Sequence, residues 1–198
     1  MADGALTPEQ ILDTAEDVLR RFGLQKTTVV DVARALGVSH GSIYRHFPSK
    51  TALREAVASR WLARVSEPLG EIAAETGPAL PRLRRWLERL IRIKRGKVLD
   101  DPELFAVYHA LADEADAVVQ EHVGKLVDQI SRMLSDGMVT GEVRFSDPRA
   151  MAWAVLRTTM VFHHPAHVGH WSLPEADVDR AFDDIFDLIT RGLTRPEA

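Results

Sequence analysis

Apolar residues recur at three- and four-residue intervals along almost the whole chain, and almost nowhere do β-branched residues alternate with polar ones. The first spacing is that of one face of a helix, whereas alternation would indicate a strand. The segment Thr7-Pro8-Glu9-Gln10 is typical of a helix start, and Gly23 is typical of a helix end. The sequence therefore predicts an all-α protein whose first helix lies between these two signals.

Three more helices are predicted in the N-terminal third. The second covers residues 28–36 and ends at Gly37, and the third covers residues 39–46. Pro48 prevents continuation of the third helix, because proline lacks the amide donor and disfavours helical backbone before it. A fourth helix begins at Ser49.

The rest of the chain predicts a second, larger helical region. A joint is expected near residues 75–78, where Gly and Pro cluster, and helices are expected over 103–112, 148–164 and 175–193 among others. We divide the chain into an N-terminal helical domain, residues 7–65, and a larger C-terminal helical domain, residues 66–198.

Charge is unevenly distributed between these parts. The net charge of the 198 residues is −4, yet residues 1–65 carry +2 and residues 66–198 carry −6, and residues 34–64 hold six basic residues against one acidic residue. Such asymmetry is expected of a nucleic-acid-binding module joined to a different one. Cysteine is absent, which excludes disulfides and thiolate chemistry. With no long apolar run and no signal peptide pattern, we expect a cytoplasmic protein.

Helix 28–36, the turn at Gly37 and helix 39–46 form a helix-turn-helix pattern. Gly37 supplies the positive φ of a sharp turn, Ala33 is small where the helices cross, and Ile43 fills the shared core. In such motifs the N-terminus of the second helix enters the major groove. The residues presented there are compact: Ser39, His40, Gly41 and Ser42.

Residues 27–53 have the sequence TTVVDVARALGVSHGSIYRHFPSKTAL. Through this stretch, residues 7–65 resemble the DNA-binding domain of the TetR family of transcriptional regulators. The resemblance implies that Thr28, Tyr44 and Lys50 hold DNA phosphates. It implies that bases are read by Ser39, His40, Gly41 and Ser42, with Arg45 and His46 one turn further along. Arg45 could pair with a guanine or hold a phosphate.

The same resemblance implies a homodimer that binds a palindromic operator, most simply as a repressor released by a small-molecule inducer. Dimerisation is expected through helices 148–164 and 175–193. Helix 148–164 is apolar around much of its circumference, which favours such an interface, with a fully buried central helix as the alternative. The alternative function is a nonspecific or architectural DNA-binding protein without an effector.

An effector pocket is expected among the central helices, but its lining is a hypothesis because aromatic and Met residues at helical spacing also build cores. The candidates are Trp61, Trp86, Phe105, Tyr108, Met133, Trp153, Met160 and Phe162. No cofactor is expected beyond this unidentified effector.

Two charged or titratable runs lie in the C-terminal domain. The basic run over residues 82–97 fits a solvated helix face, and the alternatives are a site for an anionic ligand such as an acyl-CoA or a second DNA contact. The run His163, His164, His167 and His170 could bind a metal, but Pro165 breaks the helical alignment of these residues, so no metal site is predicted. Imidazoles near a helix end also complement its dipole.

An enzyme is not expected. The chain contains no Gly-rich phosphate loop, no Gly-x-Ser-x-Gly elbow and no His-Glu-x-x-His pair. Ser39 and His40 are neighbours in sequence, and neighbouring residues on a helix do not face each other.

Overall fold

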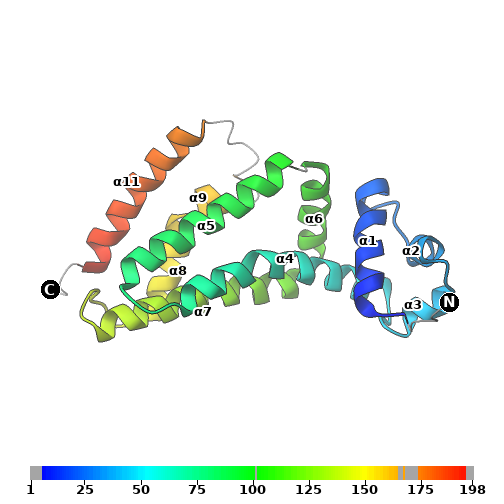
Figure 1. Ribbon diagram of the computed structural model, residues 1–198, viewed down its shortest axis with the longest axis horizontal. Coiled ribbons are helices and arrows are strands. Elements are labelled where there is room, and N and C mark those ends of the chain that lie inside the picture. Colours follow the sequence, from blue (N-terminus) through cyan, green and yellow to red (C-terminus); the bar gives the residue numbers. More distant parts are fainter. Residues whose placement is uncertain (1–5, 101, 165–166, 168–173, 195–198) are drawn as a thin grey trace. The chain divides into compact units, whose positions relative to one another are not determined.

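The computed structural model describes residues 6–100, 102–164, 167 and 174–194, and every regular element in these ranges is a helix. The predicted all-α class is thus confirmed. In chain order the helices are α1 (Pro8–Phe22), α2 (Val29–Leu36), α3 (His40–Tyr44), α4 (Lys50–Ala74), α5 (Ala79–Asp100), α6 (Pro102–Glu114), α7 (Asp116–Val139), α8 (Pro148–Thr158), α9 (Met160–His163) and α11 (Glu175–Thr194) (Figure 1).

The chain folds into two compact units. The N-terminal unit comprises Met1–Ala63 and Asp101–Gln120, and the C-terminal unit comprises Arg64–Asp100 and Glu121–Ala198. Helix α6 belongs to the N-terminal unit because it packs against α1 and contributes to the same core. The sequence suggested one boundary at residue 65, which does not account for residues 101–120 in the N-terminal unit. The assignment of DNA binding to residues 7–65 and of effector sensing to residues 66–198 stays a prediction.

Helices α1 and α2 begin with the same pair of capping hydrogen bonds. The hydroxyl of Thr7 accepts from the backbone N–H of Gln10 at 3.2 Å, and the Gln10 side chain accepts from the Thr7 N–H at 3.0 Å. Thr28 and Asp31 repeat the arrangement at 3.3 and 3.0 Å. Each pair satisfies two backbone donors that a helix start leaves without partners. The two helix starts are therefore determined by local sequence.

The turn between α2 and α3 depends on Gly37, whose φ of +69° lies in the left-handed region. Its N–H donates to the carbonyl of Arg34 at 3.2 Å. Ser39 then caps α3 by accepting from the Ser42 N–H at 3.2 Å. Helix α3 ends at Tyr44, two residues before the predicted end, because the next residues form a turn on the carbonyl of Ile43.

Apolar contacts hold the N-terminal unit together. Ile43 is fully buried in the cluster that also contains Val32 and Ala33 of α2. On the side formed by α4 and α6, Trp61 stacks on Tyr108 with ring centroids 4.6 Å apart and planes within 8°. The short helix α3 is thereby fixed to a larger apolar core.

Helix α4 continues through Pro68 to Ala74, and the joint expected near residues 75–78 follows it. The predicted helix 148–164 is wrong as a single element, since Thr159 divides it into α8 and α9. The Thr159 hydroxyl donates to the carbonyl of Val155 at 3.0 Å, a bond that competes with regular helix geometry. The predicted helix 175–193 is confirmed as α11.

The C-terminal unit brings the loop after α7 onto the start of α5. The Glu142 carboxylate accepts from the backbone N–H groups of Ala79 and Leu80 at 2.5 and 2.9 Å, which caps α5. Gly137 allows this approach, because a Cβ there would lie 2.8 Å from the Cβ of Ala79. The core beneath is apolar, and in it Trp86 donates to Gln129 at 2.9 Å.

Replacing Gly37 tests the turn. Alanine at a positive φ is strained, so Gly37→Ala should lower the free energy of unfolding by about 1–2 kcal/mol, measured by urea denaturation. The control is Gly41→Ala: this residue is helical, and its added Cβ would meet only the Ser39 Oγ at 3.7 Å. Equal stability of the two variants would contradict the role given to Gly37.

Candidate nucleic-acid interface and effector region

The predicted DNA-contacting residues lie on the outer side of α3 and on the helix starts beside it. Ser42 is half-buried, and all the others are exposed: Thr28, Ser39, His40, Gly41, Tyr44, Arg45, His46 and Lys50. Thr28 and Lys50, at the starts of α2 and α4, line one shallow depression of about 20 Å³. The structure thus brings together two residues to which the sequence assigned phosphate binding.

Local hydrogen bonds orient the polar side chains of α3. The Ser39 and Ser42 hydroxyls lie 3.0 Å apart, and Arg45 donates to the Ser42 hydroxyl at 3.3 Å. The Tyr44 ring meets the His40 ring edge-on, with centroids 6.2 Å apart. Side-chain contacts therefore connect the residues of α3 to which the sequence assigned base reading with Tyr44 and Arg45.

Thr28 has a second role besides its exposed position. Its hydroxyl donates to the Asp31 carboxylate at 2.6 Å, and this hydrogen bond lowers the pKa of Asp31 below its ordinary value. The carboxylate holds the hydroxyl at the N-terminus of α2, where backbone N–H groups favour an anionic oxygen.

Several basic residues counted in the sequence are held by acidic groups of the same unit. Arg54 pairs with Glu114 at 2.6 Å, and Arg60 pairs with Glu16 at 2.8 Å. Arg34, Arg54 and Arg60 all have such partners, which offset their positive charge. Within the described ranges, neither Arg45 nor Lys50 has an acidic side chain within ion-pair distance, and both are exposed. Their contacts with DNA stay predictions.

The eight predicted pocket residues do not form one group. Trp61, Phe105 and Tyr108 belong to the N-terminal unit. The other five belong to the C-terminal unit: Trp86, Met133 and Phe162 are buried in its core, Trp153 is half-buried, and Met160 is 40% exposed. Their role in ligand binding stays a prediction.

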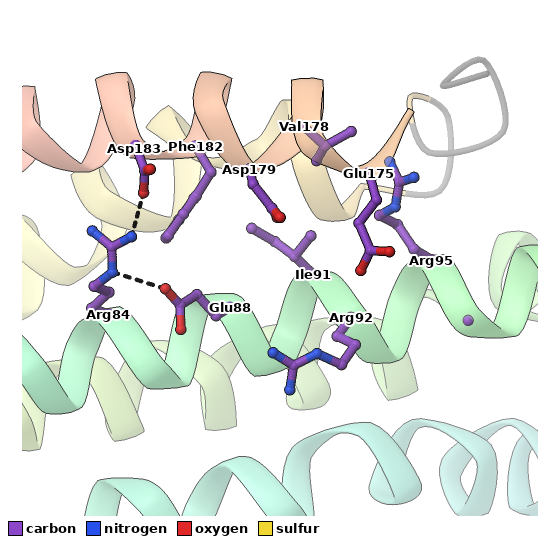
Figure 2. Close-up of a pocket in the computed structure, with 11 residues that line it drawn as sticks. Arg84, Glu88, Ile91, Arg92, Arg95, Glu175, Val178, Asp179, Phe182 and Asp183 are labelled. Atoms are coloured by element: carbon purple, nitrogen blue, oxygen red, sulfur yellow. Dashed lines mark hydrogen bonds and ion pairs between the residues drawn. The ribbon is translucent and has the colours of Figure 1, made fainter. Parts of the chain in front are cut away.

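A cleft of about 700 Å³ lies between α5 and α11, and none of the eight residues lines it. Figure 2 shows Arg84 between Glu88 and Asp183, while Arg92 and Arg95 project from α5. The acidic residues of α11 repeat at four-residue spacing opposite the arginines of α5, a signal that sequence reasoning missed. The cleft is lined by Arg84, Glu88, Ile91, Arg92, Arg95, Gly96, Glu175, Val178, Asp179, Phe182 and Asp183.

The basic run on α5 is not simply a solvated face. Arg82 is 2% exposed and pairs with Asp136 at 2.7 Å, and Lys94 is 6% exposed. The Arg84 guanidinium lies 5.6 Å from the Phe182 ring centroid and forms an ion pair with Asp183, which raises its pKa. The run therefore contributes both to packing and to polar groups inside the C-terminal unit.

Two histidines are also buried in this unit. Desolvation and the nearby charge of Lys94 lower the pKa of His122 to about 3 and that of His163 to about 4. His163 Nε2 lies 3.3 Å from the carbonyl of Leu156, to which it can donate. Both imidazoles are neutral near pH 7.

The histidine run is divided by burial. His163 is buried, whereas His164 and His167 are exposed with ring centroids 5.7 Å apart, and His170 lies outside the described residues. In the parts of the chain that the structure describes, no three His, Asp or Glu side chains gather as metal ligands.

Across those same parts, no helix has the length and apolar character that a membrane span requires.

Two family models match the chain. The model for "Bacterial regulatory proteins, tetR family" matches residues 11–57, and that for "Tetracyclin repressor-like, C-terminal domain" matches residues 79–186. Together with the helix-turn-helix fold, they define a DNA-binding transcriptional regulator. The second match covers more than half of the chain, and the chain belongs to the TetR family.

Individual relatives agree with this assignment. The HTH-type transcriptional repressor KstR of Mycolicibacterium smegmatis is 31% identical over 134 residues, which are 67% of this chain and 65% of that repressor. The repressor KstR2 of Rhodococcus jostii is 26% identical over 195 residues, 94% of this chain and 91% of its own.

Among solved structures, the transcriptional regulator FadR from Bacillus subtilis, in complex with stearoyl-CoA, superposes with a TM-score of 0.65. Its sequence is 20% identical, and the match covers 94% of this chain and all of FadR's. This likeness shows a shared fold.

The buried histidines predict acid sensitivity. An unfolded histidine has a pKa near 6.5, so the unfolded chain binds more protons than the folded chain between pH 6.5 and about 4. The free energy of unfolding should therefore fall as pH decreases through this window, by up to about 1.4 kcal/mol per pH unit for each histidine.

Urea denaturation at pH 7, 6 and 5 measures this slope. His122→Leu should reduce the slope, while replacement of the exposed His46 by leucine should leave it as in the wild type. A wild-type slope in His122→Leu would show that His122 does not contribute to the acid sensitivity.

Proposed function

We propose that the protein is a homodimeric repressor that binds a palindromic DNA operator and is released by a small-molecule effector. The observation that carries this proposal is the exposure of the polar residues of α3 and of Thr28 and Lys50 at the starts of α2 and α4, in a chain of the TetR family. One such surface is small for specific binding, and a two-fold dimer doubles it.

Exposed apolar residues on the last helices support dimerisation through α8, α9 and α11. Met160 is 40% exposed and Leu188 is 66% exposed. The alternative of a fully buried helix over residues 148–164 is contradicted, because Ala154, Arg157 and Met160 are exposed in the single chain. Exposed apolar groups on neighbouring helices are typical of a subunit interface.

Effector binding is assigned to the C-terminal unit. That unit contains the cleft between α5 and α11 and the buried polar residues near it in sequence. An effector releases DNA only if it binds the DNA-incompetent conformation more tightly, with a coupling free energy of typically about 1–3 kcal/mol.

The test is recovery of specific DNA. The purified protein is incubated with sheared DNA from its host at moderate salt, and bound fragments are sequenced. Enrichment of an inverted repeat is expected. Binding at low salt without any enriched sequence would instead favour the nonspecific architectural DNA-binding protein.

Lys50 and His40 should respond differently on the recovered operator. Lys50→Ala should weaken binding to all sequences alike and reduce the slope of log affinity against log salt by about 0.9, because one phosphate contact is lost. His40→Ala should relax preference at one operator position, with a loss of about tenfold on the preferred base. Fluorescence anisotropy over a salt series and a set of operator variants distinguishes the two effects. An equal loss of affinity for all operator variants in His40→Ala would show that His40 does not read a base.

Leu188 tests the dimer. An aspartate at this exposed apolar position would place unpaired charges in the interface, so Leu188→Asp should raise the dissociation constant of the dimer by roughly a hundredfold or more. Sedimentation equilibrium should give twice the 22.1 kDa chain mass for the wild type and the single mass for the variant. Val139→Asp is the matched control, since Val139 is 88% exposed at the end of α7. Dimers of unchanged affinity in Leu188→Asp would place the interface elsewhere.

A further inference from the structure

Three nitrogen-bearing side chains lie inside the apolar core of the C-terminal unit. Lys94 comes from α5, His122 from α7 and His163 from α9, with exposed fractions of 6%, 6% and 8%. Helices α5 and α9 pack against each other, and the charge of Lys94 acts on both histidines. We call these three residues the Lys94 cluster.

His122 is the anomaly within this cluster. Neither its Nδ1 nor its Nε2 has a hydrogen-bond partner among the described residues, although both atoms are shielded from solvent. A neutral imidazole carries one donor and one acceptor, and leaving them unsatisfied in a core costs stability. A polar group that belongs to a ligand would satisfy them.

His163 differs because its ring is already held. Its Nε2 lies 3.3 Å from the Leu156 carbonyl and 3.3 Å from the Thr159 hydroxyl. The carbonyl can only accept, so Nε2 carries the proton in that bond and Nδ1 is the acceptor. The break between α8 and α9 thus fixes one imidazole beside another that has no partner.

We propose that the Lys94 cluster binds the carboxylate of an effector whose remaining body is apolar. This inference rests on the proposed function, since it takes the C-terminal unit to be the sensor. The carboxylate would accept from the His122 N–H and lie in the field of the Lys94 ammonium, as a charge-assisted hydrogen bond requires. Leu126 and Phe162, buried in the same core, suit an apolar body.

The sign of the local charge favours an acid over an alcohol or an amine. The groups that act on the two histidines are Lys94 from α5, Lys125 from α7 and His164 after α9, together with the histidines themselves. All of these are basic. A bound anion would reverse the field at His122 and favour its protonated form, so binding near pH 6 would be accompanied by proton uptake.

The cleft between α5 and α11 is the competing location. Arg95 lines it, and its Nη1 is buried without a hydrogen-bond partner among the described residues. However, Glu175 and Asp179 line the same cleft and would repel an anion (Figure 2). A variant of Arg95 therefore separates the two locations.

The experiment is calorimetric titration of the full-length protein at pH 6 with four acids, namely acetate, benzoate, decanoate and cholate. Each acid is compared with the alcohol in which a CH2OH group replaces its carboxylate. Two buffers of different ionisation enthalpy report proton uptake. The variants are His122→Leu and Lys94→Met, with His164→Leu as the matched exposed histidine and Arg95→Leu as the cleft variant. His122→Leu replaces a group without partners by an apolar one, so it is expected to fold.

At least one acid should bind more tightly than its alcohol and take up a proton. His122→Leu should weaken that acid about tenfold or more and abolish the uptake, and Lys94→Met should remove the preference over the alcohol. His164→Leu and Arg95→Leu should bind as the wild type does. The assignment is overturned if no acid binds, if binding survives both cluster variants, or if Arg95→Leu alone abolishes it. Acids that bind at the cluster without releasing the recovered operator would leave the site intact and reject only the effector role.

Discussion

Burial of Ile43 determines whether this protein has a DNA-reading surface at all. Helix α3 has five residues, far fewer than an isolated helix needs to persist in water. Its position comes from one fully buried side chain against α2, worth about 1.5–3 kcal/mol, and from the cap at Ser39. Because one residue supplies the anchoring, the remaining side chains of α3 are free to be polar and exposed.

The same division between anchoring and exposed residues applies to charge. Arg54 and Arg60 form ion pairs with acidic residues of the N-terminal unit, while Arg45 and Lys50 are exposed. Two such cations supply little affinity from a single chain, since each phosphate contact contributes separately to salt-dependent binding. In the proposed dimer a second copy doubles these contacts, so exposed apolar residues such as Leu188 matter as much as the exposed polar residues.

The features that neighbouring residues determine could be predicted from the sequence. The helix class, the caps at Thr7 and Thr28 and the turn at Gly37 depend on residues within a few positions of each other. The features that depend on contacts between residues far apart in the sequence could not be predicted. The interruption at Thr159 depends on whether its hydroxyl bonds to the backbone of the preceding turn, as it does here to the Val155 carbonyl. Burial of Lys94, in a run that looked solvated, depends on helices α7 and α9, which are remote in sequence. The cleft between α5 and α11 escaped notice for the same reason.

His122 makes the core of the C-terminal unit less stable than an apolar core of the same shape, because both of its buried ring nitrogens lack hydrogen-bond partners among the described residues. Such local inconsistency is typical of functional positions. The chain passes between the two units after Ala63, after Asp100 and after Gln120, so α7, which carries His122, begins within the N-terminal unit. An effector that relieves the cost at His122 in only one conformation would supply the differential affinity that any release of DNA requires.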